Sequence, residues 1–243
     1  MFARLGSTFD CRVIMILGQK TSRNNSHCKL NLRMDGVNDG TSFVDSSPSG
    51  KTVTRSGALT KTAVKKFGTA SGYFDGTNDF LSLVDSDDWF WGTGDFTVEF
   101  WGHFPTIPPT IQMICNQYED ADNSNGFYMA TYLSDILIRQ RSRIAGNSTF
   151  GVTSDSTPTA AIPQNTWVHL CTSRKSGTVK FFIGGILYST ETGFLLSNLA
   201  AVLYIGAQEA TSSYYLEGYL DGFLWTKGKA IYTRNFTPPN RAA

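Results

Sequence analysis

The chain has 243 residues and a formal net charge of +1, with no run of basic residues. A nucleic-acid partner is therefore not expected, because a phosphate-binding surface needs clustered Lys and Arg side chains. Glycine is frequent, aromatic residues make up 13% of the chain and no linker-like stretch divides it, which favours one large domain of short strands and tight turns.

The first 27 residues show no strand-like pattern and are predicted to form an N-terminal arm, followed by a single domain over residues 28–243. The apolar run at residues 13–17 is much shorter than the roughly 20 residues that a membrane span needs. Asp10 and Arg12 precede this run and no small-residue cleavage site follows it, so it is a poor signal peptide. We expect no membrane span. The N-terminal segment is expected to be an arm that docks on a neighbouring subunit, and the alternative is an edge strand.

The remainder of the chain alternates apolar and polar residues in short segments, as half-buried strands do. Strands are predicted at residues 29–34, 41–44, 51–55, 80–84, 95–104, 111–117, 126–132, 135–141, 166–174, 178–183, 186–189, 202–206 and 214–226. Gly184-Gly185 is a two-residue hairpin signal, and only residues 195–201 and 229–232 are candidates for a short helical turn. This pattern predicts an all-β fold of two packed antiparallel sheets, a β-sandwich.

Residues 95–104 alternate most clearly. Phe96, Val98, Phe100 and Phe104 are expected on one face and Thr97, Glu99, Trp101 and His103 on the other. The cysteines at positions 11, 28, 115 and 171 have no close metal-ligand spacing and are expected to be free thiols.

Several short motifs, in their order along residues 30–239, resemble the laminin-G-like, concanavalin A-like β-sandwich family, a jelly roll. They are Leu-Arg-Met-Asp-Gly (32–36), Phe-Val-Asp-Ser-Ser (43–47), Lys-Lys-Phe-Gly (65–68), Gly-Tyr-Phe-Asp-Gly (72–76), Gly-Asp-Phe-Thr-Val-Glu-Phe-Trp (94–101), Thr-Trp-Val-His-Leu (166–170), Val-Lys-Phe-Phe-Ile-Gly-Gly (179–185) and Gly-Tyr-Leu-Asp-Gly-Phe (218–223). The resemblance implies that residues 72–81 form a central hairpin and that the first and last strands are neighbours. It also implies a family that mostly binds ligands and sometimes hydrolyses glycans.

The turn at residues 75–79 is the candidate metal site. Asp75, Asn78 and Asp79 offer oxygen ligands of the kind that calcium accepts. Asp221, together with Asp35, is expected to converge there if the first and last strands are neighbours, as the resemblance implies. The alternative is that these Asp and Asn residues only form turns.

Two aromatic loops are candidate ligand-binding sites. Trp89 and Trp91 lie in Asp-Asp-Trp-Phe-Trp-Gly (87–92), and Tyr214 and Tyr215 follow Thr-Ser-Ser. Aromatic rings in loops can stack on sugar rings and anchor partners. The alternative is that they are partly buried and close the ends of the sandwich.

Catalytic residues are not evident, and we expect no enzymatic activity. Glycan-cleaving relatives place carboxylates at alternate positions of one strand, but this chain has no Glu-x-Asp-x-Glu pattern and Glu99 stands alone. Glu217 and Asp221 are four residues apart, ~13 Å along a strand, whereas a retaining pair needs ~5 Å. His27, His103 and His169 share no metal-ligand spacing.

These observations lead to a hypothesis of a non-enzymatic recognition or structural module. Residues 230–239 resemble the closing segments of such domains in bacteriophage virion and tail proteins, which implies a virion surface protein made in the host cytoplasm. Its expected partners are a cell-surface glycan or other virion proteins, in a homo-oligomeric assembly. The alternatives are a glycoside hydrolase of the same superfamily and a secreted, extracellular adhesion module.

Overall fold

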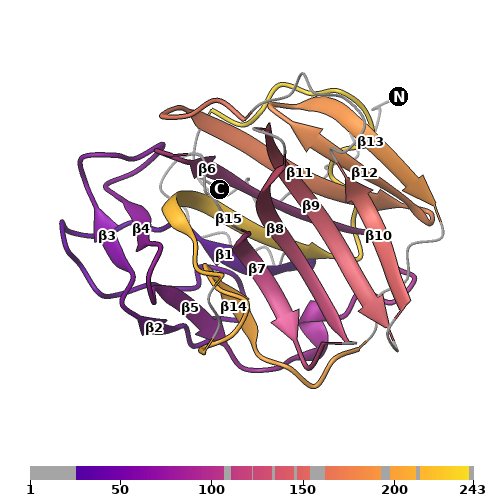
Figure 1. Cartoon of the computed structure of the whole chain (residues 1–243), viewed down its shortest axis with the longest axis horizontal. Coiled ribbons are helices and arrows are strands. Elements are labelled where there is room, and N and C mark those ends of the chain that lie inside the picture. The colour runs from indigo at the N-terminus through magenta and orange to yellow at the C-terminus, as the bar shows by residue number, and fades with distance from the viewer. Residues whose placement is uncertain are drawn as a thin grey trace, which may run out of the picture.

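The computed structural model describes residues 26–240 apart from residues 107–110, 122, 133–134, 145–146, 154–161, 193–197 and 212–213, and within residues 125–153 it describes the backbone of the strands. Two antiparallel sheets, of eight and seven strands, pack face to face (Figure 1), which confirms the predicted β-sandwich. The predicted arm, apart from its last two residues, lies outside the described residues.

The eight-stranded sheet has the order β13-β12-β11-β6-β15-β4-β3, with β1 paired to β15. Its strands are β1 (Cys28–Leu32), β3 (Leu59–Lys61), β4 (Ser71–Asp75), β6 (Phe96–His103), β11 (Trp167–Lys175), β12 (Thr178–Ile183), β13 (Ile186–Thr192) and β15 (Glu217–Lys227). The first and last strands are therefore neighbours, as expected from the family resemblance.

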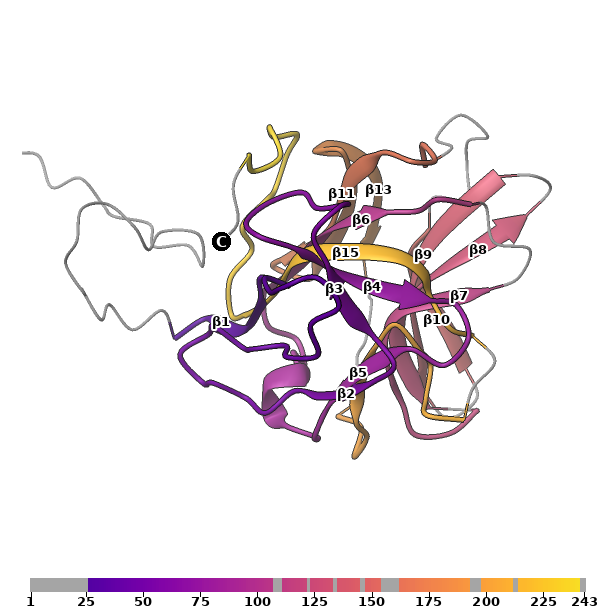
Figure 2. The same ribbon diagram turned by 90° about the vertical axis from the view of Figure 1, so that its left-hand side faces the viewer.

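The seven-stranded sheet has the order β10-β9-β8-β7-β14-β5-β2. Its strands are β2 (Thr54–Ser56), β5 (Phe80–Leu83), β7 (Gln112–Tyr118), β8 (Ser124–Tyr132), β9 (Asp135–Ile144), β10 (Asn147–Thr153) and β14 (Leu203–Ile205). Figure 2, turned by 90°, shows the two layers from the side where β1 to β5 lie.

The core lies between the sheets and is centred on β6. Phe96, Val98, Phe100 and Phe104 are at most 1% exposed and belong to one hydrophobic cluster, which confirms the alternation predicted for this strand. Strands β11 and β15 flank β6 on either side, so the strand is buried along both edges as well as on its inner face.

The outer face of the eight-stranded sheet is covered over much of its area, although its strands carry polar residues there. Glu99 Oε2 accepts hydrogen bonds from His169 Nε2 (2.9 Å) and from the Tyr232 hydroxyl (3.1 Å), and all three side chains are buried. Tyr232 stacks on Phe236 with ring centroids 3.5 Å apart, so the C-terminal segment lies over this network. A second part of the face lies beneath residues 66–67, as described below.

Three local predictions differ from the structure. Residues 72–81 do not form a hairpin, because β4 and β5 belong to different sheets and the turn between them crosses from one layer to the other. Residues 41–44 form no strand, whereas β3 and β10 lie where none was predicted. Residues 229–232 are not helical, and residues 195–197 lie outside the described part of the chain.

The Gly184-Gly185 hairpin between β12 and β13 is confirmed. Both glycines have positive φ, 58° and 82°, as a tight two-residue turn requires. A short 3-10 helix, η1 (Asp87–Trp89), follows Ser86, whose hydroxyl accepts a hydrogen bond from Asp88 N.

The cysteines divide into two groups. Cys115 and Cys171 are buried and form no disulfide, as expected, and Cys11 lies outside the described residues. Cys28 is disulfide-bonded, so the expectation of a free thiol is wrong for this residue; spacing along the chain does not show which thiols meet in space. Within the residues described, no helix is long and apolar enough to cross a membrane.

Candidate functional site

A row of aromatic side chains crosses the outer face of the eight-stranded sheet. It consists of Tyr73 on β4, Tyr219 on β15, His103 on β6 and Trp167 on β11, and we call it the aromatic row. In the strand register, Tyr219 is opposite both Tyr73 and His103, and Trp167 is opposite His103. All four side chains are half-buried. The row is therefore one line of rings, perpendicular to the strands.

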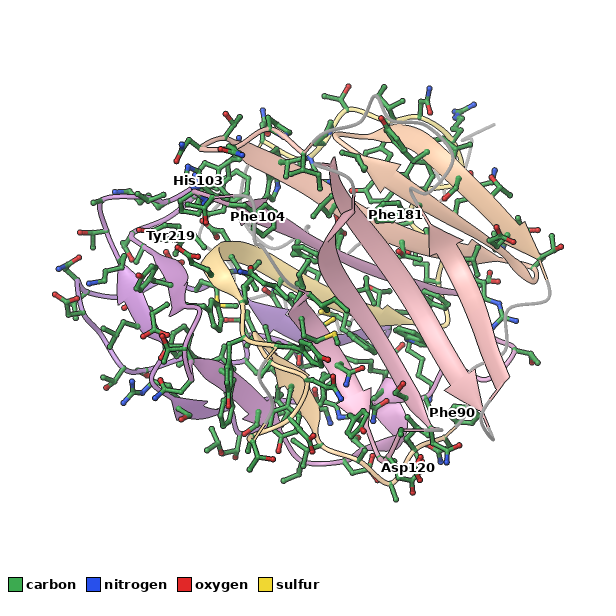
Figure 3. All side chains as sticks on the ribbon, viewed as in Figure 1. Phe90, His103, Phe104, Asp120, Phe181 and Tyr219 are labelled. Atoms are coloured by element: carbon green, nitrogen blue, oxygen red, sulfur yellow. The ribbon has the colours of Figure 1, made fainter. Side chains whose placement is uncertain are left out.

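Neighbouring rings in the row contact one another. The ring centroids are 5.0 Å apart for Tyr73 and Tyr219, 5.6 Å for Tyr219 and His103, and 5.4 Å for His103 and Trp167. Figure 3 shows His103 and Tyr219 together at one end of the molecule. Because three strand spacings separate the outer members, the row spans ~14 Å. Each ring combines an apolar surface with a polar atom, as groups that bind sugars do.

A glycine next to Tyr219 allows strands β15 and β6 to approach closely enough for Tyr219 and His103 to meet. Gly218 has φ +150°, and a Cβ atom at this position would lie 2.8 Å from the carbonyl oxygen of His103. The absence of a side chain lets β15 approach β6 closely here. We expect any larger residue at position 218 to push Tyr219 away from His103.

The loop at residues 64–69 borders the aromatic row on one side. The Phe67 ring lies edge-on to Trp101 with centroids 5.8 Å apart, and Lys66 Nζ lies 3.9 Å from the Trp101 ring centroid. Asp221 Oδ2 accepts hydrogen bonds from the backbone N–H groups of Lys66 and Phe67, both at 2.9 Å. The fully buried Asp221 carboxylate thus holds this loop over the sheet.

Burial raises the pKa of Asp221 to about 7, and the negative charge of Asp35 acts in the same direction, against the hydrogen bonds from Phe67 and Lys66. The folded protein therefore binds a proton that the unfolded chain releases near its ordinary pKa of 3.8. This contribution to stability is complete below that value and is lost as pH rises through about 7.

We expect the melting temperature to fall as pH rises from 5 to 8, and Asp221→Asn to flatten this dependence, because the amide oxygen accepts the same bonds without a charge. Thermal unfolding followed by circular dichroism at several pH values measures the effect. The same slope in the variant and in the unmodified protein would contradict the assignment to Asp221.

Trp89 and Trp91, predicted as exposed ligand-binding rings, are instead part of the core. They are only 2% and 6% exposed. Trp91 stacks between Phe96 and Trp225, with centroids 3.9 Å and 4.5 Å away, and Trp89 lies edge-on to Trp225. The polar residues flanking them sit on the 3-10 turn while the indoles point inward. Their ring faces are therefore not available to a ligand.

Tyr214 and Tyr215 lie on the segment that leads into β15. Tyr214 is 37% exposed, and its carbonyl oxygen accepts a hydrogen bond from Met113 N on β7. The Tyr215 hydroxyl donates to Ala210 O at 3.0 Å. Phe90 lies between Trp89 and Trp91 in the sequence. Figure 3 shows it at the far end of the molecule from His103 and Tyr219. The 87–92 segment is therefore far from the aromatic row.

The predicted calcium ligands are not gathered in one place. Asp79 is buried and its Oδ2 accepts a hydrogen bond from Asp75 N, while Asp75 Oδ1 accepts one from Thr77 N. Asn78 is exposed. Asp221 binds residues 66–67 instead, and Asp35 Oδ1 accepts a hydrogen bond from Thr69 N.

These carboxylates satisfy backbone N–H groups, which is the turn-forming role of Asp. Within the described residues, no group of three or more His, Cys, Asp or Glu side chains is arranged to hold a metal ion. Burial raises the pKa of Asp79, and the negative charge of Asp75 acts in the same direction, against the hydrogen bond from Asp75 N and the charge of Arg55. This geometry does not fit an ion held jointly by Asp75, Asp79 and Asp221.

Calcium binding at the 75–79 turn stays a prediction. If it occurs, binding to the folded state alone stabilises the protein by roughly 2.7 kcal/mol at a hundredfold excess over Kd. Chelation should then lower the melting temperature, and Asp79→Ala should abolish the response to added calcium. A melting temperature that is equal in chelator and in millimolar calcium would contradict calcium binding at this turn.

Sequence reasoning missed the aromatic row, although it placed His103 on the outer face of its strand. Tyr73, Tyr219 and Trp167 each stand at an outward position of a strand, next to inward-facing residues such as Phe74, Leu220 and Val168. The missing information was the pairing register. If the register of one of these strands shifted by one residue, its aromatic ring would point into the core instead of outward.

Comparison with known proteins supports the architecture. Residues 75–230 match a family model described as the concanavalin A-like lectin/glucanases superfamily. No curated protein is significantly similar to the sequence. Among solved structures, domain 4 of AbnA, a GH43 extracellular arabinanase from Geobacillus stearothermophilus in complex with arabinotriose, superposes with a TM-score of 0.64 at 15% identity, covering 84% of this chain and 94% of that one.

Two further binding domains are also similar in fold. The binding domain of Paraclostridial Mosquitocidal Protein 1 has a TM-score of 0.61 at 15% identity, covering 85% of this chain and 50% of that one. The botulinum neurotoxin serotype D binding domain has a TM-score of 0.60 at 15% identity, covering 86% and 50%. The chain thus spans about half the length of these two binding domains, and the similarity is one of fold.

Proposed function

Since the chain belongs to the concanavalin A-like lectin/glucanases superfamily, we propose that it is a non-enzymatic recognition module that binds carbohydrate on the outer face of its eight-stranded sheet. The observation that carries this proposal is the aromatic row of Tyr73, Tyr219, His103 and Trp167, which are in register across four strands and half-buried. A sheet provides a rigid support, so the rings are held in place before a ligand arrives, which lowers the entropic cost of binding.

The fold neighbours are consistent with a binding role. One is a domain of an arabinanase in complex with arabinotriose, and two are described as binding domains, of a mosquitocidal protein and of a botulinum neurotoxin. At 15% identity these neighbours support the fold, whereas the ligand class is argued from the aromatic row itself.

The absence of activity is also proposed, on the burial of two carboxylates, Glu99 and Asp221. Glu99 is 2% exposed and hydrogen-bonded to His169 and Tyr232 beneath the C-terminal segment. Asp221 is fully buried beneath residues 66–67. Neither side chain can reach a glycosidic bond in this arrangement. The glycoside hydrolase alternative predicts release of reducing sugar from polysaccharides, which a reducing-end assay on a mixed panel measures.

For the biological setting we propose the surface of a virion, in a phage tail or capsid, with the chain made in the host cytoplasm and assembled as a homo-oligomer. The support is the resemblance of residues 230–239 to closing segments of virion proteins. Tail or capsid genes beside its gene would agree with this setting. Genes for cellular adhesion or secretion in their place would favour an extracellular cellular module.

Carbohydrate binding is tested with a glycan array, probed with the unmodified protein and two matched variants. Tyr219→Ala removes a ring from the aromatic row. Tyr204→Ala removes an equally half-buried tyrosine, which contacts Phe80 on the seven-stranded sheet. We expect Tyr219→Ala to weaken binding about tenfold or more, as for an aromatic hot spot, and Tyr204→Ala to bind normally. No bound glycan, or equal loss in both variants, would contradict the proposal.

A further inference from the structure

Two carboxylates lie beside the aromatic row. Asp75 on β4 and Glu217 on β15 are opposite each other in the strand register, two residues from Tyr73 and Tyr219. Because residues i and i+2 of a strand share a face, the carboxylates stand on the same face as the two rings, ~7 Å along the strands. The row therefore has a pair of acidic residues along one side.

Neither carboxylate has an ion-pair partner among the residues that the structure describes. Asp75 Oδ1 accepts a hydrogen bond from Thr77 N at 2.8 Å, and Glu217 Oε2 accepts one from the Thr106 hydroxyl at 3.2 Å. Asp75 is exposed and Glu217 half-buried. Like charges directly opposite each other in a sheet are unfavourable, so this pair favours a positively charged neighbour.

Two cations beside the aromatic row already have other contacts. Lys61 lies 5.6 Å from the Tyr73 ring centroid and is paired with Asp39, and Lys66 lies over the Trp101 ring. The pKa of Tyr73 is raised, first by burial and then by Tyr219, Asp75, Asp79 and Glu217. The negative charges of Asp75 and Glu217 therefore act on the Tyr73 side chain.

We propose that the aromatic row selects a glycan bearing free, protonated amino groups, which Asp75 and Glu217 bind while the rings pack against the sugar. This inference rests on the proposed carbohydrate binding and names its ligand class by charge complementarity. An N-acetylated sugar offers the same apolar faces without the positive charge, and an acidic sugar is repelled by the carboxylates.

The test compares glucosamine and N-acetylglucosamine oligomers of equal length by isothermal titration calorimetry at pH 5.5. We expect the unmodified protein to bind the amine oligomer about tenfold more tightly, the effect of about one charged hydrogen bond. Glu217→Gln should remove this preference. Glu191→Gln, on the exposed far edge strand β13, is the matched control and should keep the preference.

The outcomes separate the two proposals. If both oligomers bind equally, or the acetylated one binds better, and Tyr219→Ala weakens both, the amine preference is wrong while carbohydrate binding stands. If Glu217→Gln keeps the full preference, the carboxylate is not its source and the inference is overturned. If neither oligomer binds and the glycan array is also empty, the proposed function fails.

Discussion

Val98→Asp is expected to abolish soluble folding. Val98 is fully buried in the middle of β6, between β11 and β15, and belongs to the main hydrophobic cluster. Even a neutral carboxyl buried without a hydrogen bond costs ~2–7 kcal/mol, and a charged one costs more. That is a large share of the ~5–15 kcal/mol that stabilises a typical domain. Expression in the soluble fraction and thermal unfolding measure the effect.

Val84→Asp is the matched control, since Val84 directly follows β5 and is 77% exposed. The same substitution there should leave solubility and the melting temperature nearly unchanged, because exposed substitutions change stability by about 0.5 kcal/mol or less. A soluble Val98→Asp variant with a normal unfolding transition would show that β6 is not the centre of the core.

Trp91→Ala is expected to be the second most damaging change, and it distinguishes a core residue from a binding residue. The Trp91 indole stacks between Phe96 and Trp225. Trp→Ala in a core costs about 3–5 kcal/mol, which corresponds to a fall of roughly 6–20 °C in melting temperature for a domain of this size. Differential scanning calorimetry measures it.

Trp167→Ala gives the comparison, because it removes the same side chain from the half-buried aromatic row. We expect this variant to lose much less stability than Trp91→Ala and to lose glycan affinity. The reverse result, with Trp91→Ala stable and deficient in binding, would restore the interpretation of the 87–92 segment as a ligand loop.

The fold was predictable because its signals are local. Alternation in residues 95–104 identified β6 and its core face, and Gly184-Gly185 identified the hairpin that joins β12 to β13. Strands β3 and β10 were missed, although β2 and β14, which are as short as β3, overlap predicted strands. The supposed hairpin at residues 72–81 was wrong because the sequence of a turn does not reveal whether it stays in one sheet or crosses to the other.

The site was much less predictable, because it depends on which strands pair and what covers them. Trp89 and Trp91 have polar neighbours in the sequence. In the folded chain, however, both pack in the core against Trp225, which is more than 130 residues away. Asp221 was expected at the 75–79 turn, but it binds the backbone of residues 66–67. The aromatic row itself exists only through the register of β4, β15, β6 and β11.

The most direct test of carbohydrate recognition by the aromatic row is to follow backbone amide chemical shifts by NMR while the best glycan from the array is titrated in. We predict that the largest changes occur at Tyr73, His103, Trp167 and Tyr219 and at the neighbouring 64–69 loop. Changes centred instead on Tyr214 and Tyr215, on the 75–79 turn, or on Tyr204 in the other sheet would contradict the account.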